Sequence, residues 1–274
     1  MELHNKVCLI AGASGTIGAS VARRFFQEGA RLALTYRTEK LDILSGELVD
    51  QTRVASYKLD ITDWEGTEST VREIAETFSG LDVLINCTGV VGPIGPFETL
   101  DLHEWVQTIE TNLIGSVHLV RAVIPIMKKR GRGKIVLFSG GGAAYSRPYF
   151  TPYSSSKAAL VRLVESLAGE LTSANIQVNA VAPGPVNSRM WAEMRAAASS
   201  GGVTLLRELK QMDETGGASP ERAAGLAAFL ASDRSSRLSG RLLSAIWDDW
   251  EHLEGQMEKI TSSDVWTLRR VPLN

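Results

Sequence analysis

Short apolar runs alternate with amphipathic helical patterns along nearly the whole chain, and this alternation narrows the choice of fold more than any other feature. Strands and helices in alternation form a parallel sheet, because each crossover helix returns the chain to begin the next strand in the same direction. No linker or repeat interrupts the order. We therefore predict one α/β domain whose parallel sheet carries helices on both faces.

The strands are expected at residues 7–11, 31–37, 53–58, 82–86, 134–138, 176–181 and 241–246. The helices are expected up to residue 27, at 63–78, at 102–130 with a kink near Pro125, from about 152 onward, and at 220–231.

A glycine-rich turn, residues 12–18, connects the first strand to the first helix. Backbone N–H groups and a helix N-terminus in this position can bind a pyrophosphate, as in many dinucleotide sites. An ordinary strand-to-helix turn is the alternative, because three glycines also occur by chance. The place of the glycines between strand and helix favours the dinucleotide site.

The second strand ends near Tyr36 and is followed by Arg37. Sites for NAD usually have an acidic residue here to bind the ribose hydroxyls, whereas an arginine can neutralise the 2′-phosphate of NADP. A solvated arginine after a strand is the alternative. We predict NADP as the cofactor, with NAD less favoured.

Tyr153 and Lys157 lie four residues apart in a helical pattern, on the same stripe as Leu160, Val164 and Leu167. That stripe should face the core, where a charged amine needs a partner. Residues four apart on a helix lie roughly 5–6 Å apart, and a cation at that distance favours the phenolate by about 3 kcal/mol. We predict a tyrosine whose pKa is lowered for acid–base chemistry, and a lysine that snorkels to solvent is the alternative.

Composition argues against several classes of function. A net charge of −2 gives no basic surface for nucleic acid, and the four histidines show no metal-ligand spacing. The start of the chain has no signal-peptide pattern, and the stretch 117–127 is too short and too polar to span a membrane. Cys8 and Cys87 each lie in or beside an apolar run, as reduced thiols of a cytoplasmic protein do. We expect no nucleic-acid, membrane or metal partner.

Taken together and in order, the motifs resemble those of the short-chain dehydrogenase/reductase family over residues 5–247. Tyr153 and Lys157 match the family's Y-x-x-x-K, and residues 86–89 are similar to its N-x-A-G, with Thr88 in place of alanine. The resemblance implies a single Rossmann-like, doubly wound sheet. It implies an NAD(P)-dependent oxidoreductase that acts on a carbonyl or an alcohol.

The family's glycine motif, T-G-x-x-x-G-x-G, is similar to residues 11–18, with Ala11 and Thr16 as departures. Residues 183–188 resemble its P-G-x-x-x-T, with Ser188 for threonine. By this resemblance and by Arg37, the cofactor-binding residues are expected to be Gly12, Ser14, Gly15, Ile17, Gly18, Arg37, Asp60, Asn86, Gly89, Tyr153, Lys157, Pro183, Gly184, Val186 and Ser188.

The resemblance also implies the catalytic residues Asn112, Ser139, Tyr153 and Lys157. The family's serine lies thirteen residues before the tyrosine, and that position here is Gly140, next to Ser139. Ser139 could turn inward to bond the substrate oxygen, or backbone N–H groups could replace it. For Asn112, a polar helix residue without a special role is the alternative.

The expected reaction is NADPH-dependent reduction of a carbonyl, with Tyr153 as the proton donor. Lys157 would lower the pKa of that tyrosine and hold the ribose, and Asn112 would order a water leading to Lys157. One alternative is a cofactor-binding sensor or scaffold with weak catalysis, which Thr16 and Gly140 favour. Another is NAD-linked oxidation of an alcohol.

Residues 187–219 are expected to cover a partly apolar substrate, and a packed pair of surface helices is the alternative. Residues 1–250 are expected to form the catalytic domain, and residues 251–274 to extend it. The tail, residues 267–274, is hypothesised to pack on another subunit, because enzymes of this family are commonly dimers or tetramers.

Overall fold

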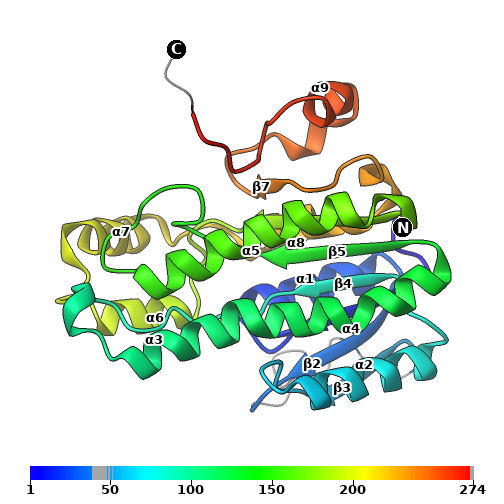
Figure 1. Ribbon diagram of the computed structural model, residues 1–274, viewed down its shortest axis with the longest axis horizontal. Helices are drawn as coiled ribbons and strands as arrows, with labels where there is room; N and C mark the ends of the chain where they lie inside the picture. Colours follow the sequence, from blue (N-terminus) through cyan, green and yellow to red (C-terminus); the bar gives the residue numbers. More distant parts are fainter. Residues whose placement is uncertain (39–47, 49, 51, 272–274) are drawn as a thin grey trace.

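The computed structural model describes residues 1–38, 48, 50 and 52–271. Seven strands in this part of the chain form one parallel sheet in the order β3-β2-β1-β4-β5-β6-β7 (Figure 1). The first strand, Val7–Ala11, reads as an unbroken apolar run because both of its faces are buried in the middle of the sheet. The strands are β1 (Val7–Ala11), β2 (Arg31–Tyr36), β3 (Val54–Lys58), β4 (Val83–Asn86), β5 (Gly133–Phe138), β6 (Ile176–Ala182) and β7 (Leu242–Ser244).

Helices cover both faces of the sheet, so the predicted Rossmann-like fold is confirmed (Figure 1). One apolar core joins α1 and α8 to the sheet, and a second joins α2, α4 and α5 to the opposite face. Every predicted strand end lies within two residues of the observed one. The helices are α1 (Thr16–Gln27), α2 (Trp64–Phe78), α3 (Leu102–Ile109), α4 (Gly115–Arg130), α5 (Thr151–Glu170), α6 (Arg189–Ala196), α7 (Gly202–Thr215), α8 (Pro220–Ala231) and α9 (Met257–Thr261).

The strand order reverses between β1 and β4, which are neighbours although β2 and β3 lie between them in the sequence. At such a point the crossover helices leave toward opposite faces of the sheet and open a crevice at the carboxyl ends of the strands. Ligands of doubly wound folds bind in this crevice.

The helix expected at residues 102–130 is interrupted at its middle instead of at Pro125. Residues Glu110–Ile114 form a π-helical turn between α3 and α4, whereas α4 runs without a break through Pro125. The side chain of Asn112 explains the site of the turn, because it both donates to the Val90 carbonyl (2.9 Å) and accepts from the Val90 N–H (2.9 Å). Such π-helical turns often mark functional sites.

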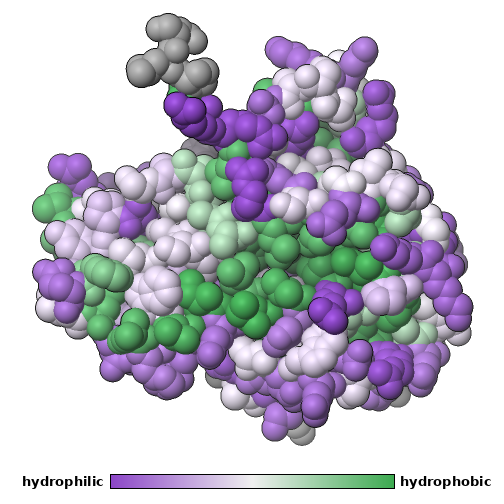
Figure 2. Space-filling model, viewed as in Figure 1, coloured by the Kyte–Doolittle hydropathy of each residue, from purple (hydrophilic) through white to green (hydrophobic). Residues whose placement is uncertain are grey.

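The same stretch, Leu102–Arg130, is long and apolar enough by length and composition to cross a membrane. Core helices of globular domains meet the same criterion. In this fold α4 covers the sheet, with Leu119, Val123 and Met127 fully buried against it. On the face seen in Figure 2, further apolar side chains gather over α4 and α5.

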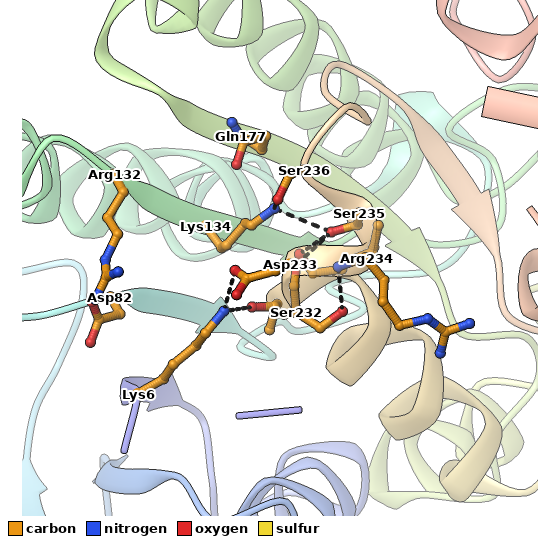
Figure 3. A network of polar contacts seen from close by, with 12 residues as sticks. Lys6, Asp82, Arg132, Lys134, Gln177, Ser232, Asp233, Arg234, Ser235 and Ser236 are labelled. Atoms are coloured by element: carbon orange, nitrogen blue, oxygen red, sulfur yellow. Dashed lines mark hydrogen bonds and ion pairs between the residues drawn. The ribbon is translucent and has the colours of Figure 1, made fainter. Parts of the chain in front are cut away.

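A polar network occupies the amino ends of the strands, opposite the crevice (Figure 3). Lys6, just before β1, forms an ion pair with Asp233 at 2.7 Å. Lys134 in β5 donates to the hydroxyls of Ser235 and Ser236, each at 3.3 Å. These contacts tie the segment after α8 to the beginning of β1 and β5.

The segment after β7 packs on its own chain. Trp250, Leu253, Met257 and Ile260 belong to the α1–α8 core. Further on, the Leu268 carbonyl accepts a hydrogen bond from Arg162 of α5 at 2.7 Å. This packing favours the prediction that residues 251–274 extend the domain formed by residues 1–250. Of the tail, residues 272–274 lie outside the described residues, and its packing on another subunit stays a hypothesis.

Candidate active site

A cleft of about 620 Å³ opens at the carboxyl ends of the strands. Its walls come from the turn after β1, the loops after β4, β5 and β6, and the helices α5, α6 and α7. Both Tyr153 and Lys157 line it. This cleft therefore lies where the strand order reverses, as the fold predicts.

Tyr153 and Lys157 are buried on the first turns of α5, which begins at Thr151 with Pro152 in its first turn. The two residues are 6% and 3% exposed, and the Lys157 amine lies 5.8 Å from the centre of the Tyr153 ring. Lys157 Nζ donates to the Phe138 carbonyl, the last of β5, at 2.9 Å. The snorkelling alternative is therefore wrong.

The predicted lowering of the Tyr153 pKa is also wrong for the protein alone. Burial raises the pKa of Tyr153 to about 12, with the charge of Arg147 acting against this rise and Tyr145 adding to it. Burial likewise lowers the pKa of Lys157 to about 8. The loss of water is the largest cause of both pKa shifts, and at pH 7 the tyrosine keeps its proton and the lysine its charge.

The hydroxyl of Tyr153 lies against the backbone of Gly140. A Cβ atom at Gly140 would be only 2.3 Å from Tyr153 Oη, so no side chain fits there while the tyrosine keeps this position. The neighbouring Ser139 is buried, lines the cleft and donates its hydroxyl to the Lys157 carbonyl at 3.3 Å. A serine side chain at position 140 would therefore clash with the Tyr153 hydroxyl in its present position.

Asn112 fixes the loop that follows β4. Besides its two bonds to Val90, it donates to Ser156 Oγ at 3.0 Å, which connects the π-helical turn to α5. A Cβ at Gly89 would lie 3.3 Å from Lys157 Nζ and 3.4 Å from Asn112 Oδ1. Gly89 therefore allows the loop to approach both polar groups closely.

The glycine turn after β1 is built for close backbone approach. Gly12 has φ +77°, and a Cβ at Gly18 would lie 2.2 Å from the Gly12 carbonyl oxygen. The N-terminus of α1 begins at Thr16, immediately after Gly15. This backbone can receive a pyrophosphate at a helix N-terminus, so the residues present fit a nicotinamide dinucleotide.

The structure brings most of the predicted cofactor residues to one cleft, together with the missed Thr16 and Thr88. The predicted residues that line it are Ser14, Gly15, Ile17, Gly18, Gly89, Tyr153, Lys157, Pro183, Gly184, Val186 and Ser188.

Four other predicted residues lie outside the cleft wall: Gly12, Arg37, Asp60 and Asn86. Asn86 accepts from the N–H of Thr88 at 3.0 Å and from its hydroxyl at 2.6 Å, so it shapes the loop that does line the cleft. Arg37 is exposed after β2 and interacts electrostatically with Asp60, which follows β3. Arg37 and Asp60 therefore lie at the β2–β3 edge of the sheet, on the other side of β1 from β4.

Residues 187–219 contain α6 and α7, which pack as a helix pair and also line the cleft. Leu205 and Leu209 are buried with Phe150 and Trp191 in a small apolar core, as in a packed helix pair. The side chains that also line the cleft are Met190, Trp191, Met194 and Met212. The two helices thus line one end of the cleft with several apolar side chains, and that they cover a substrate stays a prediction.

Sequence reasoning missed several other lining residues at the substrate end. Tyr145 and Arg147 belong to the loop between β5 and α5, Glu208 to α7, and Trp247 follows β7. Loop residues show no periodicity that could have predicted their direction. Among the described residues, no cluster of three or more His, Cys, Asp or Glu side chains could hold a metal ion.

Comparison with known proteins points to the same family that the sequence motifs resemble. Residues 6–199 match the family model "short chain dehydrogenase". The chain is 32% identical over 245 residues to the 3-oxoacyl-[acyl-carrier-protein] reductase FabG of Thermotoga maritima, covering 89% of this chain and 97% of that protein. It is 36% identical over 243 residues to the oxidoreductase UcpA of Salmonella typhimurium, covering 87% and 92%.

Solved structures agree with these sequence matches. NAD⁺-bound xylitol dehydrogenase superposes with a TM-score of 0.82 at 26% identity, over 89% of this chain and 98% of that one. Actinorhodin polyketide ketoreductase with NADPH gives 0.80 at 26% identity, over 88% and 95%. The chain therefore belongs to the short-chain dehydrogenase/reductase family, and it is an NAD(P)-dependent oxidoreductase.

Proposed function

We propose that this protein is an NADPH-dependent ketoreductase, which reduces a small-molecule carbonyl to its alcohol. The observation that carries the proposal is the buried Tyr153 hydroxyl at the cleft wall, with the Lys157 amine held beside it. Because burial raises the pKa of Tyr153 to about 12, this residue is an acid at pH 7. Protonation of a carbonyl oxygen uses that acid directly, whereas alcohol oxidation would need the phenolate.

A bound nicotinamide supplies the hydride, and the chain's own residues handle the proton. Tyr153 donates its proton to the substrate oxygen as charge develops there. An ammonium group has three donors, and the bond from Lys157 to Phe138 uses one. The others are directed at the ribose hydroxyls in our proposal. Asn112 positions the loop after β4 and leads a water toward Lys157.

We assign the fifteen predicted residues to the cofactor, with the glycine turn around the pyrophosphate. Arg37 supports NADP over NAD, because the exposed guanidinium follows β2, where the adenosine ribose is expected. Asp60 would contact the adenine. Of the two solved relatives above, one contains NADPH and the other NAD⁺, so the cofactor has to be measured.

Ser139 is proposed as the second hydrogen-bond donor to the substrate oxygen. Its hydroxyl bonds the Lys157 carbonyl in this structure, at a long 3.3 Å. A rotation about χ1 would free this donor at little cost, since the bond is weak.

The test incubates the purified protein with NADPH and a panel of ketones and aldehydes. The fall in NADPH absorbance measures the consumption of the cofactor. NADH in place of NADPH is the matched control for cofactor choice. Turnover with a preference for NADPH is expected. NADPH binding without turnover of any carbonyl would instead favour the sensor or scaffold, for which the absence of a serine at Gly140 is the supporting observation.

We also propose a homodimer or homotetramer in the cytoplasm. Val117 and Ile124 of α4 and Leu163 of α5 are half-buried apolar side chains. In Figure 2, apolar side chains gather over these two helices. Exposed apolar patches of this kind mark protein contacts. Gel filtration with light scattering measures the assembly, and a monomer would contradict this proposal.

The cysteines support the proposed cytoplasmic location. Cys8 and Cys87 are free thiols, as in reducing compartments.

A further inference from the structure

The chain after α9 returns toward β7, the edge strand of the sheet (Figure 1). We call residues 263–268 the strap. The carbonyl of Trp266 in the strap accepts a hydrogen bond from the Leu242 N–H of β7 at 2.8 Å. The N–H of Leu268 donates to Glu165 Oε1 of α5 at 2.6 Å. The strap is thus bonded to β7 and to α5, and the match to the family model ends well before it.

A buried arginine anchors the beginning of the strap. Arg241, just before β7, is only 9% exposed. Its Nη1 donates to the carbonyls of Ser263 at 2.9 Å and Val265 at 2.7 Å. A buried guanidinium that lost these acceptors would destabilise the fold. The strap is therefore a fixed part of the domain.

Trp266 has a strained backbone within the strap. Its φ is +60°, a left-handed conformation that is rare for a bulky residue. Such strain persists only where surrounding contacts determine the conformation, and it accumulates at functional sites. The Trp266 side chain is half-buried and packs against the α1–α8 core.

The indole of Trp266 also fixes a carboxylate of the cleft wall. Trp266 Nε1 donates to Asp248 Oδ1 at 2.9 Å, and Asp248 Oδ2 accepts from the Ser244 N–H at 2.6 Å. Hydrogen bonds to a carboxylate are charge-assisted and strong. Asp248 and Ser244 line the cleft, whereas Trp266 does not. Trp266 therefore acts on the cleft through Asp248.

The loop of residues 244–248, which Asp248 closes, packs on the loop after β6. The Ala245 N–H donates to the Ala182 carbonyl at 2.9 Å. A Cβ at Gly184 would lie only 2.7 Å from Ile246 Cδ1, so Ile246 packs directly on this glycine. Gly184 lines the cleft and is one of the residues that we assign to the cofactor. The position of residues 244–248 thus limits where the loop after β6 can lie.

The loop after β6 lies close to the proposed proton donor. Strands β5 and β6 are neighbours, and the Tyr153 hydroxyl lies against Gly140 in the loop after β5. The proton and the hydride must reach the same carbonyl group. The reacting end of the cofactor is therefore expected beside the loop after β6.

We propose that Trp266 is a positioning residue for this end of the cleft. Through Asp248 it holds residues 244–248 against Gly184, and this contact keeps the loop after β6 in the orientation that hydride transfer needs. Trp266 itself contacts neither substrate nor cofactor. This inference rests on the proposed function and adds to it a residue of the C-terminal extension.

The first test measures hydrogen exchange of the protein without cofactor, by mass spectrometry. Trp266→Phe keeps the aromatic character of the side chain and removes only its N–H donor. Backbone amides in residues 184–188 and 244–248 should exchange about tenfold faster in this variant, because the hydrogen bond that holds Asp248 is lost. Exchange in α1 and α8 should stay at the wild-type rate. Unchanged exchange in residues 184–188 would contradict the proposal.

The second test follows a single turnover of NADPH, with the protein in excess over the cofactor and the carbonyl saturating. In Trp266→Phe the rate constant should fall by about tenfold, because the reacting groups are held less well in line. NADPH affinity should stay close to that of the wild type, since the glycine turn still binds the pyrophosphate. A purely structural loss would lower the amplitude and leave the rate constant unchanged, and that result would overturn the inference.

Asp248→Ala tests the route from Trp266 to the cleft. This variant lacks the acceptor of the indole N–H, so adding Trp266→Phe to it should slow the single turnover no further. If the two changes multiplied in full, Trp266 would act by another route and the proposal would be wrong.

Arg162→Met is the matched control. It also removes one hydrogen bond to the strap, the bond to the Leu268 carbonyl, on the α5 side and away from Asp248. This variant should keep wild-type exchange in residues 184–188 and the wild-type rate constant. Equal changes in Arg162→Met and Trp266→Phe would mean that any loosening of the strap has this effect, against a specific role of Trp266.

Failure of the proposed function remains distinguishable, because the exchange measurement needs neither cofactor nor substrate. If no carbonyl is reduced, faster exchange in residues 184–188 of Trp266→Phe, but not of Arg162→Met, still supports the positioning of this loop by Trp266. The same exchange in both variants and the wild type refutes it.

Discussion

Two buried lysines lie at the two ends of strand β5, and burial lowers the pKa of each to about 8. Lys134 is near the beginning of the strand, where Ser235 and Ser236 accept its hydrogen bonds outside the cleft. Lys157 bonds the last carbonyl of the strand, inside the cleft and beside Tyr153. The same pKa shift thus occurs at a structural site and at a proposed catalytic one, and only the surroundings of the two amines differ.

The largest difference between the two ends of β5 should appear when each lysine is replaced in turn. Lys157→Met should lower kcat for carbonyl reduction by about a thousandfold, because it removes the charge beside the tyrosine and a ribose donor. Lys134→Met should leave kcat near the wild-type value, with steady-state NADPH consumption as the measurement. Equal losses in both variants would break the distinction between the two ends of β5.

Gly140→Ser puts back the family's serine and should nevertheless lower kcat, by about tenfold to a hundredfold. The reason is the 2.3 Å approach between a Cβ at this position and Tyr153 Oη, which forces the tyrosine to move. Gly169→Ala is the control, because a Cβ there meets nothing within 4 Å. A gain in activity for Gly140→Ser would show that the tyrosine accommodates the serine.

Cofactor choice tests the role of Arg37, which follows β2 outside the cleft wall. Arg37→Leu should raise KM for NADPH by about tenfold, since it removes a charge-assisted bond to the 2′-phosphate. KM for NADH should change little. If the two cofactors respond alike, Arg37 is only a solvated arginine after β2.

The pH dependence of carbonyl reduction should also distinguish Lys157 from Lys134. Below pH 8 Lys157 keeps its proton and its charge, so reduction should be constant there and fall by half near pH 8. Lys134→Met should keep this profile although the pKa of Lys134 is also about 8. If the rate of the Lys134→Met variant did not change with pH, the titration would belong to Lys134 and not to Lys157.

The lysines should also affect stability, with a defined sign. Burial lowers the folded-state pKa of Lys157 to about 8 from the ordinary 10.5, so between these values the unfolded chain binds more protons. Stability should therefore rise with pH across this window. In Lys157→Met this rise should be smaller than in the wild type, as measured by urea unfolding.

Sequence patterns predicted the strands well because burial on both faces of a parallel sheet favours an unbroken apolar run, as in Val7–Ala11. They also predicted Tyr153 and Lys157, whose chemistry depends on residue type and helical spacing. The sign of the Tyr153 pKa shift could not be predicted, because it depends on how completely distant segments exclude water.

Other features depend on contacts between residues far apart in the sequence. The π-helical turn occurs where Asn112 bonds the backbone of Val90, so no local pattern marks it. The pairing of Arg147 with Glu208 joins a loop to a helix 61 residues away. Such pairs become visible only in three dimensions.

The central claim is that Tyr153 is the proton donor, and Tyr153→Phe tests it most directly. The ring stays in place, so NADPH should bind with nearly wild-type affinity, as measured by its fluorescence. NADPH consumption with a carbonyl that the wild type reduces should fall by about a thousandfold or more. Turnover at the wild-type rate in this variant would contradict the account.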